Sequence, residues 1–72
     1  MKYTQVRSFH AVAKAGSFTG AARALNVSQP TITEQVRELE ATYGIEVFNR
    51  AQRKIKLTTT GRSLFEITQR LF

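Results

Sequence analysis

The chain has 72 residues, enough for one domain with a thin core, and its lack of Cys and single His argue against stabilisation by a disulfide or a bound metal. Eleven Lys and Arg against five Glu give a formal net charge of +6, which favours a polyanionic partner. No stretch is long and apolar enough to cross a bilayer and no signal peptide is visible, so we expect a cytoplasmic protein with no membrane partner.

The first half of the chain predicts two helices in close succession. Apolar residues recur at helical spacing over residues 3–15, and Gly16 ends this first helix. Ser17 can cap a second, shorter helix that ends at the turn-forming Asn26. The apolar positions of the second helix fall at i, i+3, i+4 and i+7, and they are Phe18, Ala21, Ala22 and Leu25.

A third helix is predicted over residues 29–43. Ser28 supplies its cap, Pro30 fits its first turn, and Gly44 supplies a left-handed stop. The joint between the second and third helices is only residues 26–28, which predicts a helix-turn-helix. The expected buried stripe of the third helix is Ile32, Val36, Leu39 and Tyr43.

After Gly44 the pattern changes from helix to strand. Val47 and Phe48, and then Ile55 to Leu57, predict two short strands of a hairpin, whose segment 49–56 we call the wing. Thr58 can cap a fourth helix with an apolar seam made of Gly61, Leu64, Thr68 and Leu71, beside Phe65 and Phe72. Because this seam runs to the last residue, we expect the chain to be the front part of a longer protein.

The exposed face of the third helix carries short hydrogen-bonding side chains. An amide such as Gln29 can bond adenine N6 and N7 in the major groove of DNA, and a Thr can contact a thymine methyl, a base or a phosphate. An ordinary solvated surface is the alternative interpretation. The residues of this face are Gln29, Thr31, Thr33, Glu34 and Arg37.

The charges favour the wing as the source of attraction to phosphate. The third helix contains Arg37 and three Glu, whereas every charged residue of the wing is basic. These residues are Arg50, Arg53, Lys54 and Lys56. Basic side chains at a hairpin tip can enter a narrow minor groove. The alternative is a charged edge that prevents strand aggregation.

Catalytic and metal-binding patterns find no support. A hydrolytic triad needs a base and an orienting carboxylate, yet the chain has one His, His10, and no Asp. His10 has no ligand-type neighbours, so we interpret it as a surface or boundary residue. The four Gly form no nucleotide-binding loop, and we expect no enzyme activity, no cofactor and no metal.

The whole pattern resembles the amino-terminal domain of the LysR-type transcriptional regulators. The residues that carry the resemblance are Phe9, Gly16-Ser17-Phe18, Ala21-Ala22, Leu25, Ser28-Gln29-Pro30, Leu39-Glu40, Gly44, Phe48, Arg50, Leu57-Thr58 and Gly61. The resemblance implies a mainly α fold, with a winged helix-turn-helix over residues 1–57 and the start of a dimerising linker helix over residues 58–72. In that family an effector-binding domain follows, which this chain does not contain, so a small-molecule effector would act through that domain.

The residues and the resemblance together give an expected site. We expect sequence-specific binding of promoter DNA by a homodimer in the bacterial cytoplasm, associated with the nucleoid when bound. Ser28 would cap the recognition helix near a phosphate, and Glu34 could accept from cytosine N4 or pair with Arg37. The expected DNA-binding residues are Ser28, Gln29, Pro30, Thr31, Thr33, Glu34, Arg37, Arg50, Arg53 and Lys54, and the expected dimer contacts are Leu64, Phe65, Thr68, Leu71 and Phe72.

Two other functions remain open. The fourth helix could serve a protein-interaction module, with the basic charge only aiding solubility, or it could pack back on the core. Non-specific architectural or RNA binding is disfavoured, because the wing carries no aromatic residue on which bases could stack.

Overall fold

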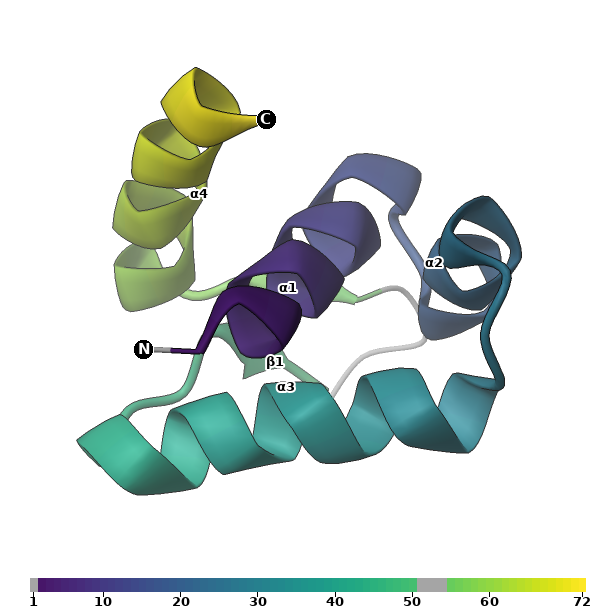
Figure 1. Cartoon of the computed structure of the whole chain (residues 1–72). Helices are drawn as coiled ribbons and strands as arrows, with labels where there is room; N and C mark the ends of the chain where they lie inside the picture. The colour runs from purple at the N-terminus through teal and green to yellow at the C-terminus, as the bar shows by residue number, and fades with distance from the viewer. Residues whose placement is uncertain (1, 51–54) are drawn as a thin grey trace.

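The computed structural model describes residues 2–50 and 55–72, which form four helices and one short hairpin (Figure 1). The elements are α1 (Tyr3–Ala15), α2 (Phe18–Leu25), α3 (Gln29–Tyr43), β1 (Phe48–Asn49), β2 (Lys56–Leu57) and α4 (Thr59–Leu71). The predicted order of helices and hairpin is confirmed, and so is the mainly α, winged helix-turn-helix fold.

The helix bounds follow from local chemistry at their ends. Asn26 and Gly44 adopt left-handed backbone conformations, with φ of 57° and 62°, and thereby end α2 and α3. Hydroxyl side chains cap three helix starts, each contributing about 1 kcal/mol by satisfying a free N–H group. The caps are Ser17, Ser28 and Thr58, whose oxygens accept from the backbone N–H groups of Gly20, Thr31 and Gly61.

The core lies where α1, α2, α3 and the start of the hairpin meet. Its largest side chains are Phe9 on α1 and Phe48 on β1, whose ring centroids lie 5.3 Å apart. Phe18 on α2 packs edge-on against Phe48 at 5.8 Å. The other fully buried apolar residues include Val12, Ala21, Ile32, Val36, Leu39 and Val47.

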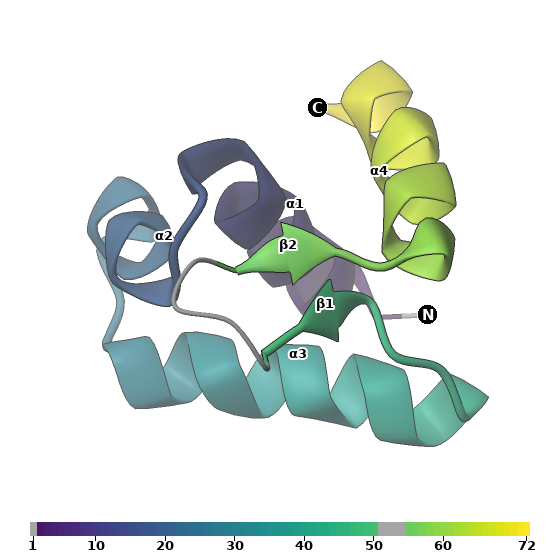
Figure 2. The same ribbon diagram turned by 180° about the vertical axis from the view of Figure 1, so that it is seen from behind.

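The prediction that Tyr43 continues the buried stripe of α3 is wrong, because its side chain is 44% exposed. Ile32, Val36 and Leu39 are fully buried, as predicted. The last turn of α3 extends past the start of α1, near the N-terminus, in both ribbon views (Figures 1 and 2). Tyr43 therefore keeps the helical spacing of the buried stripe, but α1, which covers the earlier positions, does not extend far enough to cover it.

Two polar contacts join α1 to α3 beside the core. Ser8, fully buried on α1, donates to the Oε1 atom of Gln35. Gln5 donates from Nε2 to the Glu38 carboxylate at 3.4 Å. These pairs satisfy polar groups that would otherwise be costly at a helix crossing.

The hairpin lies along α3 on the side seen in Figure 2. Phe48 pairs with Leu57 and Asn49 with Lys56 in antiparallel register. The chain then returns to the start of the hairpin, because the N–H group of Thr58 donates to the Val47 carbonyl at 3.1 Å.

α4 leaves the hairpin and packs against α1 through His10. Thr68 is fully buried, and its Oγ1 atom lies 2.8 Å from His10 Nδ1. The Thr68 Oγ1 atom also lies 3.1 Å from the Phe65 carbonyl oxygen, so this hydroxyl joins the His10 ring to the backbone of α4. In the described parts of the chain, every helix is too short or too polar to span a membrane.

Candidate nucleic-acid interface

The start of α3 is an open helix end with a defined cap. Ser28 accepts the backbone N–H group of Thr31 at 3.3 Å, and the two hydroxyl oxygens lie 2.8 Å apart. Pro30 occupies the first turn, and no acidic residue lies there to neutralise the positive end of the helix dipole. The remaining amides and hydroxyls can therefore receive a phosphate oxygen.

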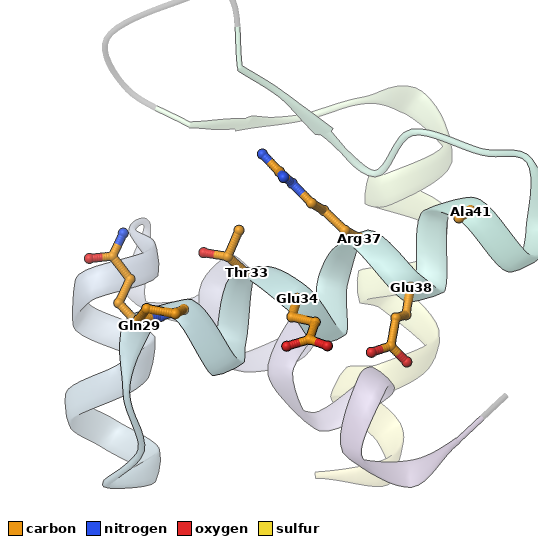
Figure 3. A pocket seen from close by; sticks show the side chains of 7 residues that line it. Gln29, Thr33, Glu34, Arg37, Glu38 and Ala41 are labelled. Atoms are coloured by element: carbon orange, nitrogen blue, oxygen red, sulfur yellow. The ribbon is translucent and has the colours of Figure 1, made fainter.

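Three side chains on the outer face of α3 form what we call the polar stripe, made of Gln29, Thr33 and Arg37. They are spaced at i, i+4 and i+8, and in Figure 3 they extend to the same side of the helix. Gln29 and Arg37 are exposed and Thr33 is half-buried. At 1.5 Å per residue the stripe spans about 12 Å, which suits the floor of a major groove.

The acidic residues of α3 lie off this stripe. Figure 3 shows the carboxylates of Glu34 and Glu38 on the opposite side of the helix from the Arg37 guanidinium. Glu38 accepts from Gln5, and Glu40 forms an ion pair with Arg50 at 3.1 Å. Within the described ranges, Glu34 therefore remains the unpaired acid on this helix, and the alternative in which it pairs with Arg37 is not observed. The stripe itself carries a net positive charge.

An open surface concavity runs along this face of α3, from Gln29 and Pro30 at one end to Ala41 at the other. Its lining includes the polar stripe and also Glu34 and Glu38, so the two acids border this surface although their carboxylates point away from the Arg37 guanidinium. The surface is therefore accessible to a large partner along three turns of the helix.

Arg50, predicted as a DNA contact on the wing, directly follows β1 and contacts the fold itself. Its guanidinium pairs with Glu40 and lies 5.6 Å from the ring centroid of Phe18. The side chain keeps 37% of its surface exposed. Arg53 and Lys54, the other predicted wing contacts, lie outside the described residues, whereas Lys56 on β2 is exposed.

The predicted dimer contacts on α4 divide into two groups. Thr68 is buried against His10, and Leu64 and Phe65 are half-buried, so these residues pack at least partly within the chain. Leu71 and Phe72 are 69% and 45% exposed. Ile67, which the sequence analysis did not include, is 57% exposed and joins them beside Tyr3 in an apolar concavity between α1 and α4.

Two other residues, which the sequence pattern does not predict, contact the site. Thr19 on α2 donates from its hydroxyl to Oε1 of Gln29 at 3.3 Å. Glu40 joins α3 to the hairpin through Arg50 and the N–H group of Val47. Neither contact follows a periodic pattern, because each joins residues seven to ten positions apart on different elements.

The fold combines two helices joined by a tight turn, a polar outer face on the second helix, and a hairpin beside it. These features define a winged helix-turn-helix domain of the kind that binds DNA. Residues 3–62 match the family model of the bacterial regulatory helix-turn-helix proteins of the lysR family, and the chain belongs to this family. The predicted resemblance is thus confirmed. The family consists of transcription regulators, which confirms the prediction that the chain is not an enzyme.

Individual relatives agree with this assignment. The chain is 42% identical over 71 residues to the HTH-type transcriptional regulator TcbR of Pseudomonas sp. (strain P51), covering 99% of this chain and 24% of TcbR. It is 45% identical over 64 residues to the regulator PtxR of Pseudomonas aeruginosa, covering 89% of this chain and 20% of PtxR. The chain thus spans about a quarter or less of these relatives.

Solved structures of the family include complexes with DNA. The chain superposes on the BenM DNA-binding domain bound to catB site 1 DNA with a TM-score of 0.94 and 34% identity, covering 99% of this chain and 80% of that one. For the CbnR DNA-binding domain in complex with DNA, the TM-score is 0.90 and the identity 42%, covering 99% and 82%.

Proposed function

We propose that this chain binds double-stranded promoter DNA in a sequence-specific manner, as the DNA-binding domain of a LysR-type transcription regulator. The observation that carries the proposal is the polar stripe on α3, whose one charged member is Arg37. Glu38 and Glu40 have partners on other segments, and the Glu34 carboxylate points away from the Arg37 guanidinium. α3 would lie in the major groove with Gln29, Thr33 and Arg37 toward the base edges. The DNA complexes of BenM and CbnR domains with the same fold support this placement.

The start and the middle of α3 would have separate roles in the complex. The capped start, with Ser28, Pro30 and Thr31, would receive a backbone phosphate and fix the register on the duplex. Further along, the Arg37 guanidinium could bond guanine O6 and N7 or a phosphate. Register would thus come from the cap and discrimination from the stripe.

The wing would supply non-specific attraction. Its sequence holds four cations and no acid, and it begins at residue 49, shortly after α3 ends at Tyr43. We place it at the minor groove or at the adjacent phosphates. Because Arg50 is already paired with Glu40, we assign it mainly to holding the hairpin against α3, and assign phosphate contact to Arg53, Lys54 and Lys56.

The domain would act as a homodimer through α4. The support is the group of exposed apolar side chains at the end of this helix, Ile67, Leu71 and Phe72. In this proposal residues 1–57 form the DNA-binding unit and residues 58–72 begin the linker helix. A small-molecule effector would act through a domain outside this chain, and the regulator would work in the cytoplasm at the nucleoid.

Fluorescence anisotropy across a salt series tests the proposal. A duplex obtained by selection from random sequence is compared with a scrambled duplex of equal length. We expect tighter binding to the selected duplex, with log affinity falling by about 0.9 per phosphate neutralised for each unit of log salt. Equal and salt-insensitive binding to both duplexes would reject it.

A protein-interaction module is the second candidate, favoured by the same exposed apolar group on α4. Sedimentation of the chain and of Leu71→Glu separates the two functions. The interaction module alone would be supported if the chain self-associates, Leu71→Glu abolishes this self-association, and the chain does not bind DNA.

A further inference from the structure

A residue outside α3 holds the first residue of the polar stripe. Thr19 lies in the first turn of α2, and its Oγ1 atom is 3.3 Å from Oε1 of Gln29. An amide oxygen carries no hydrogen, so the Thr19 hydroxyl is the donor in this contact. Both side chains are exposed, so the hydrogen bond lies on the surface that faces the proposed DNA.

The backbone around the two residues is fixed, so their contact is a property of the helix-turn-helix. Asn26 holds a left-handed conformation between the helices, and the N–H group of Val27 donates to the Ala22 carbonyl at 3.0 Å. Caps fix both helix starts, through Ser17 for α2 and Ser28 for α3. The distance from Thr19 to Gln29 is therefore set by the turn.

The hydrogen-bond inventory of Gln29 shows what remains free for a base. The amide has two N–H groups on Nε2 and two lone pairs on Oε1, and Thr19 occupies one lone pair. The other lone pair and both N–H groups stay available. Adenine in the major groove offers an N6 donor and an N7 acceptor, which need one lone pair and one N–H group.

We propose that Thr19 is a specificity-determining positioning residue, whose hydroxyl orients the Gln29 amide to bond the N6 and N7 atoms of an adenine. Because the amide is held before DNA arrives, less rotational freedom is lost on binding. The inference rests on the proposed function, since it needs α3 in the major groove.

The test uses two variants that differ in the hydroxyl. Thr19→Val keeps the branched shape and removes the donor, whereas Thr19→Ser keeps the donor. Binding is measured on four duplexes that differ only at the base pair where Gln29→Ala loses discrimination. Circular dichroism of each variant confirms that the fold is intact, which we expect because Thr19 is exposed.

We expect the unaltered chain and Thr19→Ser to prefer adenine at this position by about 10-fold or more, the range of a bidentate contact. Thr19→Val should lower that preference by about 3- to 10-fold, on the scale of one hydrogen bond, with affinity for a scrambled duplex and its salt dependence unchanged. Such a result would identify a residue that changes the base preference without contributing to phosphate binding.

Three results would overturn the inference. The first is an unchanged preference in Thr19→Val, and the second is an equal loss on all duplexes, which indicates a phosphate contact. The third is a preferred base other than adenine in the unaltered chain. If the unaltered chain distinguishes no duplex from another, the proposed function fails as well, so the two failures are distinguishable.

Discussion

Glu40 on α3 and Arg50, the residue after β1, form an ion pair at 3.1 Å, and the same carboxylate accepts the N–H group of Val47 at 2.9 Å. Val47 is fully buried, and the Arg50 guanidinium also contacts the Phe18 ring. One carboxylate therefore connects the recognition helix, the hairpin and α2. This connection holds Val47 and Arg50, on either side of β1, against α3.

Replacing Glu40 should destabilise the fold more than replacing an exposed acidic residue. Glu40→Ala leaves the N–H group of buried Val47 without its partner and removes the ion pair, so we expect a loss of about 1–3 kcal/mol in the free energy of unfolding. Urea denaturation measures it. Glu46→Ala, a change at an exposed acid nearby, is the control and should stay within about 0.5 kcal/mol. Equal effects of the two variants would show that the Glu40 contacts contribute nothing.

Gly61 permits the close approach of α4 to the hairpin. A Cβ atom at this position would lie 2.0 Å from the Val47 carbonyl oxygen, a backbone atom that cannot move aside cheaply. We expect Gly61→Ala to cost about 1–3 kcal/mol or more, as overpacking does. Thr60→Ala, at the neighbouring exposed position, is the matched control. A thermal melt of Gly61→Ala that equals that of Thr60→Ala would disprove the steric constraint.

His10 should make the stability of the chain depend on pH. Burial of the ring lowers the pKa of His10, and the charge of Lys14 lowers this pKa further. Since the pKa is lower in the folded than in the unfolded chain, the unfolded chain binds more protons in this range. The stabilisation is complete above about pH 6.5, the usual value for His, and is lost as the pH falls through it toward the folded pKa.

His10 is the only His in the chain, so one variant isolates the effect. His10→Gln keeps a side chain that can form a hydrogen bond with Thr68 and removes the titrating group. Urea denaturation between pH 5 and 8 should show stability falling with acidification in the unaltered chain and a flatter profile in His10→Gln. Identical slopes for the two proteins would contradict this account of His10.

Glu34 should oppose DNA binding through its charge. It is exposed beside the polar stripe and has no partner within the described residues. If it serves only as a repulsive charge, Glu34→Gln should raise affinity for selected and scrambled duplexes alike, by an amount that shrinks with added salt. Weaker binding to the selected duplex alone would instead indicate a contact with cytosine N4.

The helix bounds could be predicted because the signals for them are local. Ser28 and Thr58 mark starts and Gly44 marks an end within a few residues of the backbone groups they satisfy. Burial was less predictable, since it depends on what lies opposite. Tyr43 has the correct spacing for the core, yet α3 extends beyond the helix that would cover it.

The site could be predicted in composition but not in its connections. Gln29, Thr33 and Arg37 share one face by helical spacing alone, whereas the partners of Gln29 and Glu40 lie on other elements. Thr68 illustrates the same limit, because its burial depends on His10, which is 58 positions away. Sequence periodicity places a residue on a face, and tertiary contacts decide what it binds there.

Gln29→Ala tests whether the polar stripe of α3 distinguishes base sequences. Anisotropy is measured on the selected and the scrambled duplex, with Gln69→Ala, an exposed change on α4, as the control. The account predicts that Gln29→Ala loses about 1–3 kcal/mol on the selected duplex and little on the scrambled one, with an unchanged salt slope. Equal losses on both duplexes, or no loss on the selected one, would contradict it.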